Sequence, residues 1–286
     1  MTLLALLLGS VGLADLLAHL GTSRRDRLSP RRLWAPAVIG AAAFVAGAAT
    51  TGTPWGWWPA GAAAVVGWLL ATRETARSTA GSGAVSYWAV SYWAVGALAA
   101  AIAAAFVWGG ALPTPRGALV DWYDALPYAA LGGVGFTTFA LVVGGALFLV
   151  ESANVVVRLA LRGEKSSRPA DGAAAVIPAA PTRRWWRRGV APATSTEQVF
   201  VELGVVELRG GRFIGPLERL FLLALVLSGQ FTAIAALVAA KGIIRFPEIS
   251  KDAAGGSKAE YFLVGSFASW TLVLLVTLLV LLGPTR

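Results

Sequence analysis

The feature that most constrains this chain is a series of apolar runs, each close to 20 residues long, separated by short polar or basic segments. Thr2 to Leu20 is one such run, and the last ends at about Leu282. An α-helix of about 20 apolar residues matches the hydrocarbon thickness of a bilayer. It also satisfies its own backbone hydrogen bonds within lipid. The runs therefore predict an all-α protein, a multi-pass transmembrane helical bundle of seven or eight membrane segments.

The composition agrees with a membrane protein and removes several kinds of chemistry. Hydrophobic residues make up 57% of the chain and charged residues 14%, against about 25% charged in soluble domains. There is no cysteine and one histidine, His19, which excludes disulfides, thiolate nucleophiles and His-rich zinc sites. No Gly-rich phosphate loop or Ser-centred nucleophile elbow is present in the sequence. We therefore predict a protein without enzymatic activity, cofactor or metal.

The basic residues fall in alternate loops, which predicts the orientation of the chain. Segments 21–34, 73–83 and 158–212 hold 5, 2 and 10 Lys or Arg residues, whereas 53–59 and 109–125 hold 0 and 1. Cytoplasmic loops carry the excess of Lys and Arg. The three basic segments, 21–34, 73–83 and 158–212, are therefore expected in the cytoplasm, with the N-terminus outside. Because most of the 24 basic residues are Arg in a chain rich in Ala and Gly, we expect a bacterial protein of the cytoplasmic membrane.

A stretch rich in Pro, Ala, Ser and Arg divides the apolar runs into two groups. We expect an N-terminal five-helix membrane region over 1–162, a flexible cytoplasmic basic linker over 163–196 and a C-terminal membrane module over 197–286. The fifth helix is predicted from about Leu126 to Val150.

The linker contains a motif of Arg and Trp that favours contact with the membrane surface. Arg beside Trp suits phosphate contact and base stacking, as in nucleic-acid binding. In a cytoplasmic tether next to a bilayer, the same six residues more simply contact anionic lipid headgroups. We therefore expect the lipid bilayer, and not nucleic acid, as the partner of Arg183, Arg184, Trp185, Trp186, Arg187 and Arg188.

The segment 213–246 is too long for one ordinary span. As a single helix it would measure about 51 Å, against a hydrocarbon core of about 30 Å. A break at Gly229-Gln230 would divide it into two arms and bring Glu218 and Lys241 to equal depth, where they can pair. We therefore predict a helical hairpin at 213–246, with a single long span as the alternative.

Four clusters in the C-terminal module occur in a recognisable order. They read IGxLER over 214–219, GQxxAI over 229–234, AAKxxxRFxE over 239–248 and EYxxxGS over 260–266. Over about 205–282 the module resembles a family of uncharacterised bacterial multi-pass membrane proteins, a domain of unknown function. The N-terminal half departs from that family. A His-Asp-Phe-Gln type of cluster is expected in the first helix, whereas this chain has only Asp15 and His19, in the reverse order. The resemblance implies no particular reaction.

The ionisable residues within apolar sequence are the candidates for a functional site, because each costs several kcal/mol at membrane depth unless it is paired or hydrated. The C-terminal group could form a polar site or an ion path inside the bundle. The simpler interpretation is a structural ion-pair cluster near the cytoplasmic interface. The N-terminal group could form a proton relay or half of a metal site, or its members could make ordinary polar contacts at the membrane interface and at the end of a span. The first group comprises Glu218, Arg219, Lys241, Arg245 and Glu260, and the second Asp15, His19 and Glu151.

Three classes of function remain. We expect an integral membrane protein that acts as a non-enzymatic scaffold or partner-binding component. The alternative is a small transporter or channel that uses the C-terminal charges and the broken helix as its path. An intramembrane enzyme, with Glu218 or Glu260 as acid or base, is the third. A water-filled cavity at the charges would favour transport, a closed ion-pair cluster the scaffold, and a lipid-open cleft with an unpaired carboxylate the enzyme.

Overall fold

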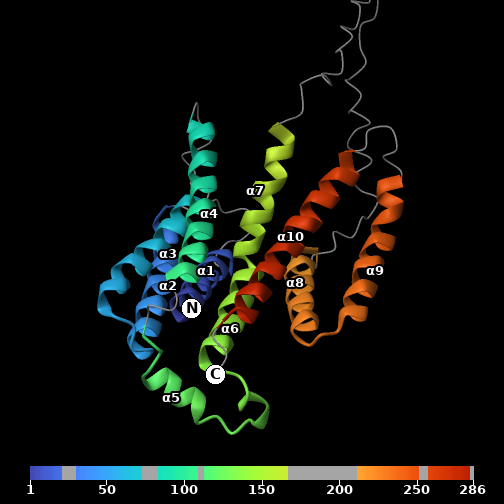
Figure 1. Cartoon of the computed structure of the whole chain (residues 1–286). Helices are drawn as coiled ribbons and strands as arrows, with labels where there is room; N and C mark the ends of the chain where they lie inside the picture. Colours follow the sequence, from blue (N-terminus) through green and yellow to red (C-terminus); the bar gives the residue numbers. More distant parts are fainter. Residues whose placement is uncertain (21–29, 73–82, 109–112, 167–210, 251–256, 284–286) are drawn as a thin grey trace, which may run out of the picture.

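The structure is helical throughout the residues that it describes, with connecting turns and no strand among them (Figure 1). The computed structural model describes residues 1–20, 30–72, 83–108, 113–166, 211–250 and 257–283. The all-α prediction is confirmed for these residues. The α-helices are α1 (Thr2–Leu20), α2 (Pro30–Thr50), α3 (Trp58–Thr72), α4 (Gly83–Trp108), α5 (Ala118–Asp124), α6 (Phe136–Val150), α7 (Ser152–Ser166), α8 (Gly211–Leu227), α9 (Phe231–Ser250) and α10 (Ser257–Leu281), and two short 3₁₀ turns are η1 (Trp55–Trp57) and η3 (Ala129–Leu131).

Two of the described helices are long and apolar enough to cross a membrane, namely α1 and the Ala259–Leu281 part of α10. A third span results if α6 and the following Ser152–Leu161, which are bent by 50° relative to each other, are one broken span. The other apolar helices are shorter over their described lengths, and α3 has 15 residues. The described residues therefore contain two or three candidate spans, and the predicted seven or eight are not confirmed.

The predicted fifth helix, from about Leu126 to Val150, differs from the structure at its start. Its first ten residues form η3 and turns, and α6 begins only at Phe136. This stretch contains Pro127 and three glycines, which disfavour a helix. At the other end, α7 begins directly after Glu151, so this residue ends α6 and lies at a bend of 50° between two helices.

The backbones of α1 and α6 approach each other closely because glycines face each other across them. A Cβ at Gly12 would meet the backbone of Leu147, and a Cβ at Gly144 would meet the carbonyl oxygen of Ala5. This contact forms the centre of a core shared by α1, α2, α3, α6 and α10. Its buried residues are Leu4, Leu8, Val11, Ala14, Phe44, Ala48, Val65, Trp68, Phe148 and Leu279.

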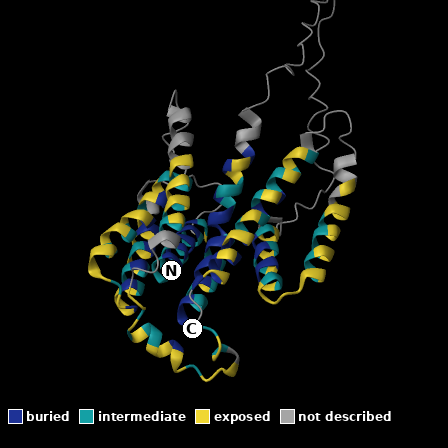
Figure 2. Ribbon diagram, viewed as in Figure 1, coloured by how far each residue is buried: buried dark blue, intermediate teal, exposed yellow. Residues whose placement is uncertain are grey.

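A second core joins α10 to α6, α7 and α8. Its buried residues are Leu149, Ala153, Leu222, Leu223, Val273 and Val276. In Figure 1, α10 runs from the end of the molecule to which α7 extends to the opposite end, where both termini and α5 lie. Figure 2 shows buried residues along α6 and the adjoining part of α7, and many exposed residues on α9, which packs mainly on α8. The cores therefore place the start of α7 between α1 on one side and the α8–α9 hairpin on the other.

Candidate functional site

An ion pair joins the two arms of the α8–α9 hairpin. α8 ends at Leu227, the chain turns through Gly229 at a φ of 68°, which suits glycine, and α9 begins at Phe231. Lys241 Nζ lies 2.7 Å from Glu218 Oε1. The predicted turn and the predicted pairing are both present in the structure.

Helix α10 supplies aromatic partners to this pair. Trp270 Nε1 donates a hydrogen bond of 3.0 Å to the same Glu218 Oε1. Lys241 Nζ lies 5.3 Å from the ring centroid of Trp270 and 5.7 Å from that of Phe262, within the range of cation–π attraction. The side chains of Lys241 and Glu218 are 24% and 14% exposed, so the pair is mostly shielded from solvent.

Arg219 connects the hairpin to the bend between α6 and α7. Its side chain is buried, and a terminal nitrogen of its guanidinium donates to Asn154 Oδ1. Asn154 Nδ2 in turn donates to Glu151 Oε2 over 3.0 Å. The Glu151 and Glu218 carboxylates both interact electrostatically with Arg219. A buried guanidinium is expected to have such partners, because an unpaired charge in this environment is costly.

Glu151 extends the connection to α1. Its second oxygen, Oε1, lies 2.9 Å from His19 Nδ1. One carboxylate therefore joins an imidazole on one side to the amide of Asn154 on the other. The bend at Glu151 places this side chain between α1 and α8.

Asp15 forms a second buried contact between α1 and the start of α7. Its Oδ2 accepts a hydrogen bond of 2.8 Å from Trp68 Nε1 and one of 2.6 Å from Ser152 Oγ. The side chain is completely buried, and two donors on one carboxylate oxygen compensate for part of its lost hydration. Ser152 adjoins Glu151, so both carboxylate contacts of α1 meet the same bend.

These contacts form one group, which we call the polar cluster. It draws side chains from α1, α3, α7, α8, α9 and α10 and from the bend before α7. Its members are Asp15, His19, Trp68, Glu151, Ser152, Asn154, Glu218, Arg219, Lys241 and Trp270.

The sequence predicts two separate groups of ionisable residues, and the structure joins members of both. The link is Arg219 through Asn154 to Glu151. Glu260 is exposed in the first turn of α10, and the side chain of Arg245 and the motif 183–188 lie outside the described residues.

Four members of the polar cluster are absent from the predicted site, namely Ser152, Asn154, Trp68 and Trp270. Ser152 directly follows Glu151, and that adjacency in apolar sequence is a signal that could have found it. Nothing in the sequence marks Trp68 and Trp270 as members of a polar site, because a tryptophan in an apolar helix ordinarily packs as a large apolar side chain. In the structure both indoles donate to carboxylates.

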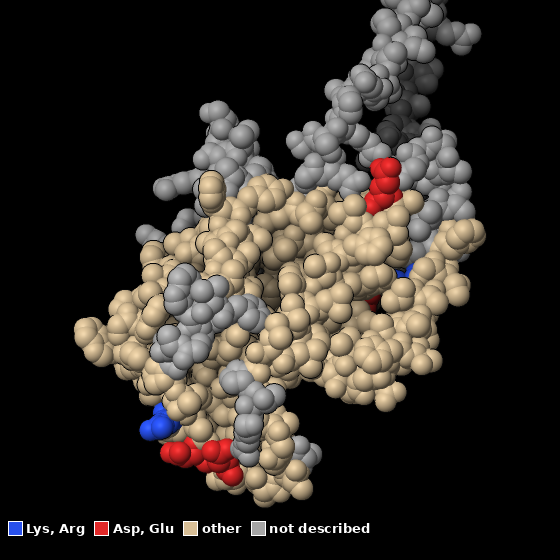
Figure 3. All heavy atoms as spheres, viewed as in Figure 1, with Lys and Arg blue, Asp and Glu red and all other residues tan. Residues whose placement is uncertain are grey.

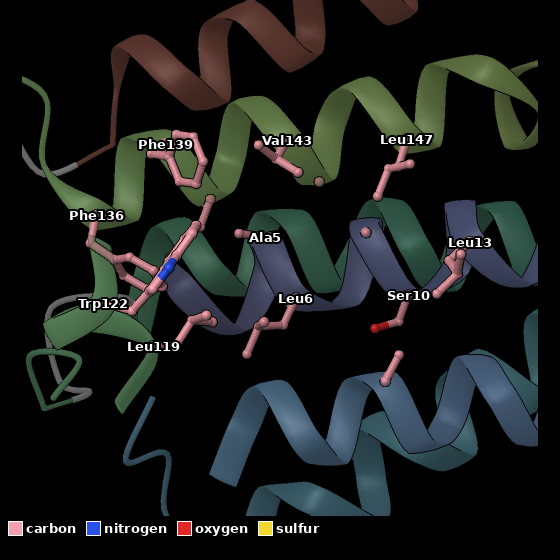
Figure 4. A pocket seen from close by; sticks show the side chains of 14 residues that line it. Ala5, Leu6, Ser10, Leu13, Leu119, Trp122, Phe136, Phe139, Val143 and Leu147 are labelled. Carbon is pink, nitrogen blue, oxygen red and sulfur yellow. The ribbon is translucent and has the colours of Figure 1, made fainter. Parts of the chain in front are cut away.

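A shallow apolar groove lies apart from the polar cluster, along α1 and α6 and closed at one end by α5 (Figure 4). Its volume is about 300 Å³. Leu6, Phe139 and Trp122 are among its lining residues, and Ser10 is the polar one. Nothing in this lining offers a titratable group, so the groove suits an apolar occupant.

The chemistry open to the polar cluster is limited by Arg219. A guanidinium does not release its proton under ordinary conditions, and a fixed positive charge opposes the passage of a proton. It therefore separates the His19–Glu151 pair from the Glu218–Lys241 pair. Among the described residues, no group of three or more acidic or histidine side chains is arranged to hold a metal ion.

The fold and the site define a class: an all-helical protein, over its described residues, with two or three helices able to span a membrane and a buried network of ion pairs between them. Comparisons with protein-family models, with curated proteins and with solved structures find no match to this chain.

Proposed function

We propose that this chain is a multi-pass protein of the bacterial cytoplasmic membrane that acts as a non-enzymatic scaffold or partner-binding component. The single observation that supports this role best is the closure of the polar cluster. Asp15, Glu151, Glu218 and Lys241 all engage protein partners, and the groove described above lies elsewhere and is apolar. An ion-pair network of this kind holds helices in one arrangement without needing a substrate.

The surface supports a membrane location. On the face shown in Figure 3, the described charged side chains gather at the two ends of the molecule, apart from a recessed group, and the middle is uncharged. Trp55 and Trp57 of η1 and Trp122 of α5 are exposed. Arg116 N donates to Thr51 O, which ties the loop before α5 to the end of α2 near η1. Exposed tryptophans grouped in this way are typical of a membrane–water interface.

The proposed topology has seven or eight membrane segments and an external N-terminus. Counting the α6–α7 pair as one broken span and α8 and α9 as two segments of a hairpin gives eight. A hairpin enters and leaves on the same side, so six segments cross. Six crossings would leave both termini on the same side of the membrane.

Reconstitution into liposomes tests the scaffold role against transport. The scaffold proposal predicts no flux of protons or alkali cations above that of empty liposomes, at any pH difference or membrane potential. It also predicts a specific crosslinked partner in bacterial membranes from a photoreactive residue at Ile244, which is exposed on α9. Flux above that of empty liposomes that changes in Arg219→Gln but is unaltered in the matched surface variant Arg116→Gln would refute the scaffold and establish transport.

One observation favours a transporter as the second candidate. Among the described residues, Arg219 Nε is buried and has no hydrogen-bond partner. A buried donor of this kind is commonly satisfied by an internal water. It lies beside a helix broken at Glu151, and broken helices form the binding sites of many transporters. The same flux assay decides between the two candidates.

A further inference from the structure

Glu151 makes two sets of contacts and lies between a titratable group and the hairpin. His19 Nδ1 contacts its Oε1, while Asn154, which holds Arg219, contacts its Oε2. His19 is the one histidine of the chain and the residue whose ordinary pKa, about 6.5, lies near neutrality. A change in the charge of His19 therefore alters the electrostatic environment of the Glu151 carboxylate. That carboxylate holds Asn154, which accepts the hydrogen bond of Arg219.

The described elements that pack on α1 contribute only a few titratable or charged side chains near the imidazole of His19. α1 itself contributes Asp15, the bend and α7 contribute Glu151 and the exposed Arg158, and α4 contributes Tyr92, whose hydroxyl donates to Leu159 O. The described side chains of α2, α3 and α6 include no titratable group. Among the described side chains beyond α7, the hairpin supplies two cations to this site, Arg219 and Lys241.

The sign of the coupling follows from these charges. The hairpin brings two cations, Arg219 and Lys241, and one carboxylate, Glu218, to a site that already holds Asp15 and Glu151. While the imidazole is neutral, the attraction between the hairpin and the carboxylates is strongest. A proton on His19 gives Glu151 a competing cation and adds repulsion toward Arg219.

We propose that protonation of His19 and docking of the α8–α9 hairpin on α7 oppose each other through Glu151, so that acid loosens the hairpin. The ligand of this site is a proton, and the responding element is the hairpin. By linkage, each event weakens the other by the same factor. This coupling between protonation and hairpin docking goes beyond a scaffold role, and it would operate in any of the three classes of function considered above.

Thiol accessibility tests this coupling cleanly, because the chain contains no native cysteine. Ala153 of α7 is fully buried in the core that includes Leu222 and Leu223 of α8, so departure of the hairpin removes part of what shields Ala153→Cys from reagent. Ala48 is equally buried in the other core, and Ala48→Cys is the matched control. The ratio of their labelling rates in the full chain, in lipid nanodiscs, cancels the intrinsic pH dependence of thiol chemistry.

The expected result is a rise of about fivefold or more in this ratio between about pH 8.5 and about pH 5.5, the lower range of typical coupling between sites. His19→Gln should keep the ratio low at both pH values, and His19→Lys, a permanent cation, should keep it high at both. A flat ratio in the otherwise unaltered chain would overturn the proposal. So would a pH response that survives in His19→Gln, because the carboxylates would then be responsible.

Nuclear magnetic resonance of ¹³C-labelled histidine gives an independent readout that requires no substitution. The chain has one histidine, so one signal reports the proton on His19 directly. A signal that stays in one protonation state between about pH 5.5 and about pH 8.5 would also overturn the proposal.

Discussion

Replacing Lys241 with methionine should destabilise the protein by more than replacing both members of its ion pair. Lys241→Met leaves Glu218 mostly buried with Trp270 as its remaining hydrogen-bond donor. Breaking a fully buried pair costs about 3–5 kcal/mol, whereas exposed pairs contribute about 0–1 kcal/mol. The side chains of Lys241 and Glu218 are 24% and 14% exposed, and Trp270 still donates, so we expect about 2–3 kcal/mol.

The double variant Glu218→Gln with Lys241→Met should cost only about 1 kcal/mol, because the amide oxygen of glutamine still accepts from Trp270 and no buried charge remains. Glu218→Gln alone should cost about 1–2 kcal/mol, since Lys241 can turn toward solvent. The expected coupling energy is therefore about 2 kcal/mol or more. Unfolding of the purified protein in mixed micelles, followed by tryptophan fluorescence, measures all four corners of the cycle.

Additive effects of the two substitutions would refute this reasoning. They would mean that Glu218 and Lys241 do not depend on each other for stability, and that apolar contacts of α8 with α6 and α10 hold the hairpin. Arg116→Met is a control for loss of one cation, because Arg116 lies in the loop before α5. It should change stability by less than about 0.5 kcal/mol.

Three further outcomes are expected. Trp68→Phe should lower the free energy of unfolding by about 1–2 kcal/mol, measured by the same unfolding assay, because the buried Asp15 carboxylate loses the indole donor. Gly144→Ala should destabilise the protein by more than about 2 kcal/mol, because the added methyl group would clash with α1. Gly67→Ala should stabilise the protein by up to about 1 kcal/mol, because open space surrounds this position of α3. Equal effects of the two substitutions would contradict the close contact of α1 and α6. A cysteine at Ser29 should react with a membrane-impermeant reagent only after the cytoplasmic side is opened, and labelling of intact cells would reverse the proposed orientation.

The hairpin could be predicted because its determinants are local. The length of 213–246 and the glycine at 229 mark the turn, and equal spacing of Glu218 and Lys241 from it predicts their pairing. The contact of Arg219 with Asn154 could not be predicted, since 65 residues separate them and no periodicity reports a tertiary contact of that kind.

Glu151 shows why a charge beside an apolar run is ambiguous in sequence. A carboxylate at the end of a span and one at a bend within a span have the same neighbours along the chain. What distinguishes them is the presence of partners from other helices, here His19 on one oxygen and Asn154 on the other. The same limit applies to Trp68, whose role as a donor depends on where Asp15 lies.

The position of Arg219 along the chain has a consequence for the biogenesis of the protein. Arg219 is the ninth of the 17 residues of α8, and an arginine at the centre of a helix costs about 2.5–3.5 kcal/mol on entering the bilayer from the translocon. Asn154 and Glu151 are synthesised earlier and, in the proposed topology, would already be in the membrane when α8 leaves the ribosome. α8 is thus expected to enter by docking on a preformed acceptor, and the order of synthesis becomes the order of assembly. A nascent chain that stops before residue 211 would keep the contacts of Glu151 with His19 and Asn154 but would lack the guanidinium that Asn154 Oδ1 accepts in the full chain.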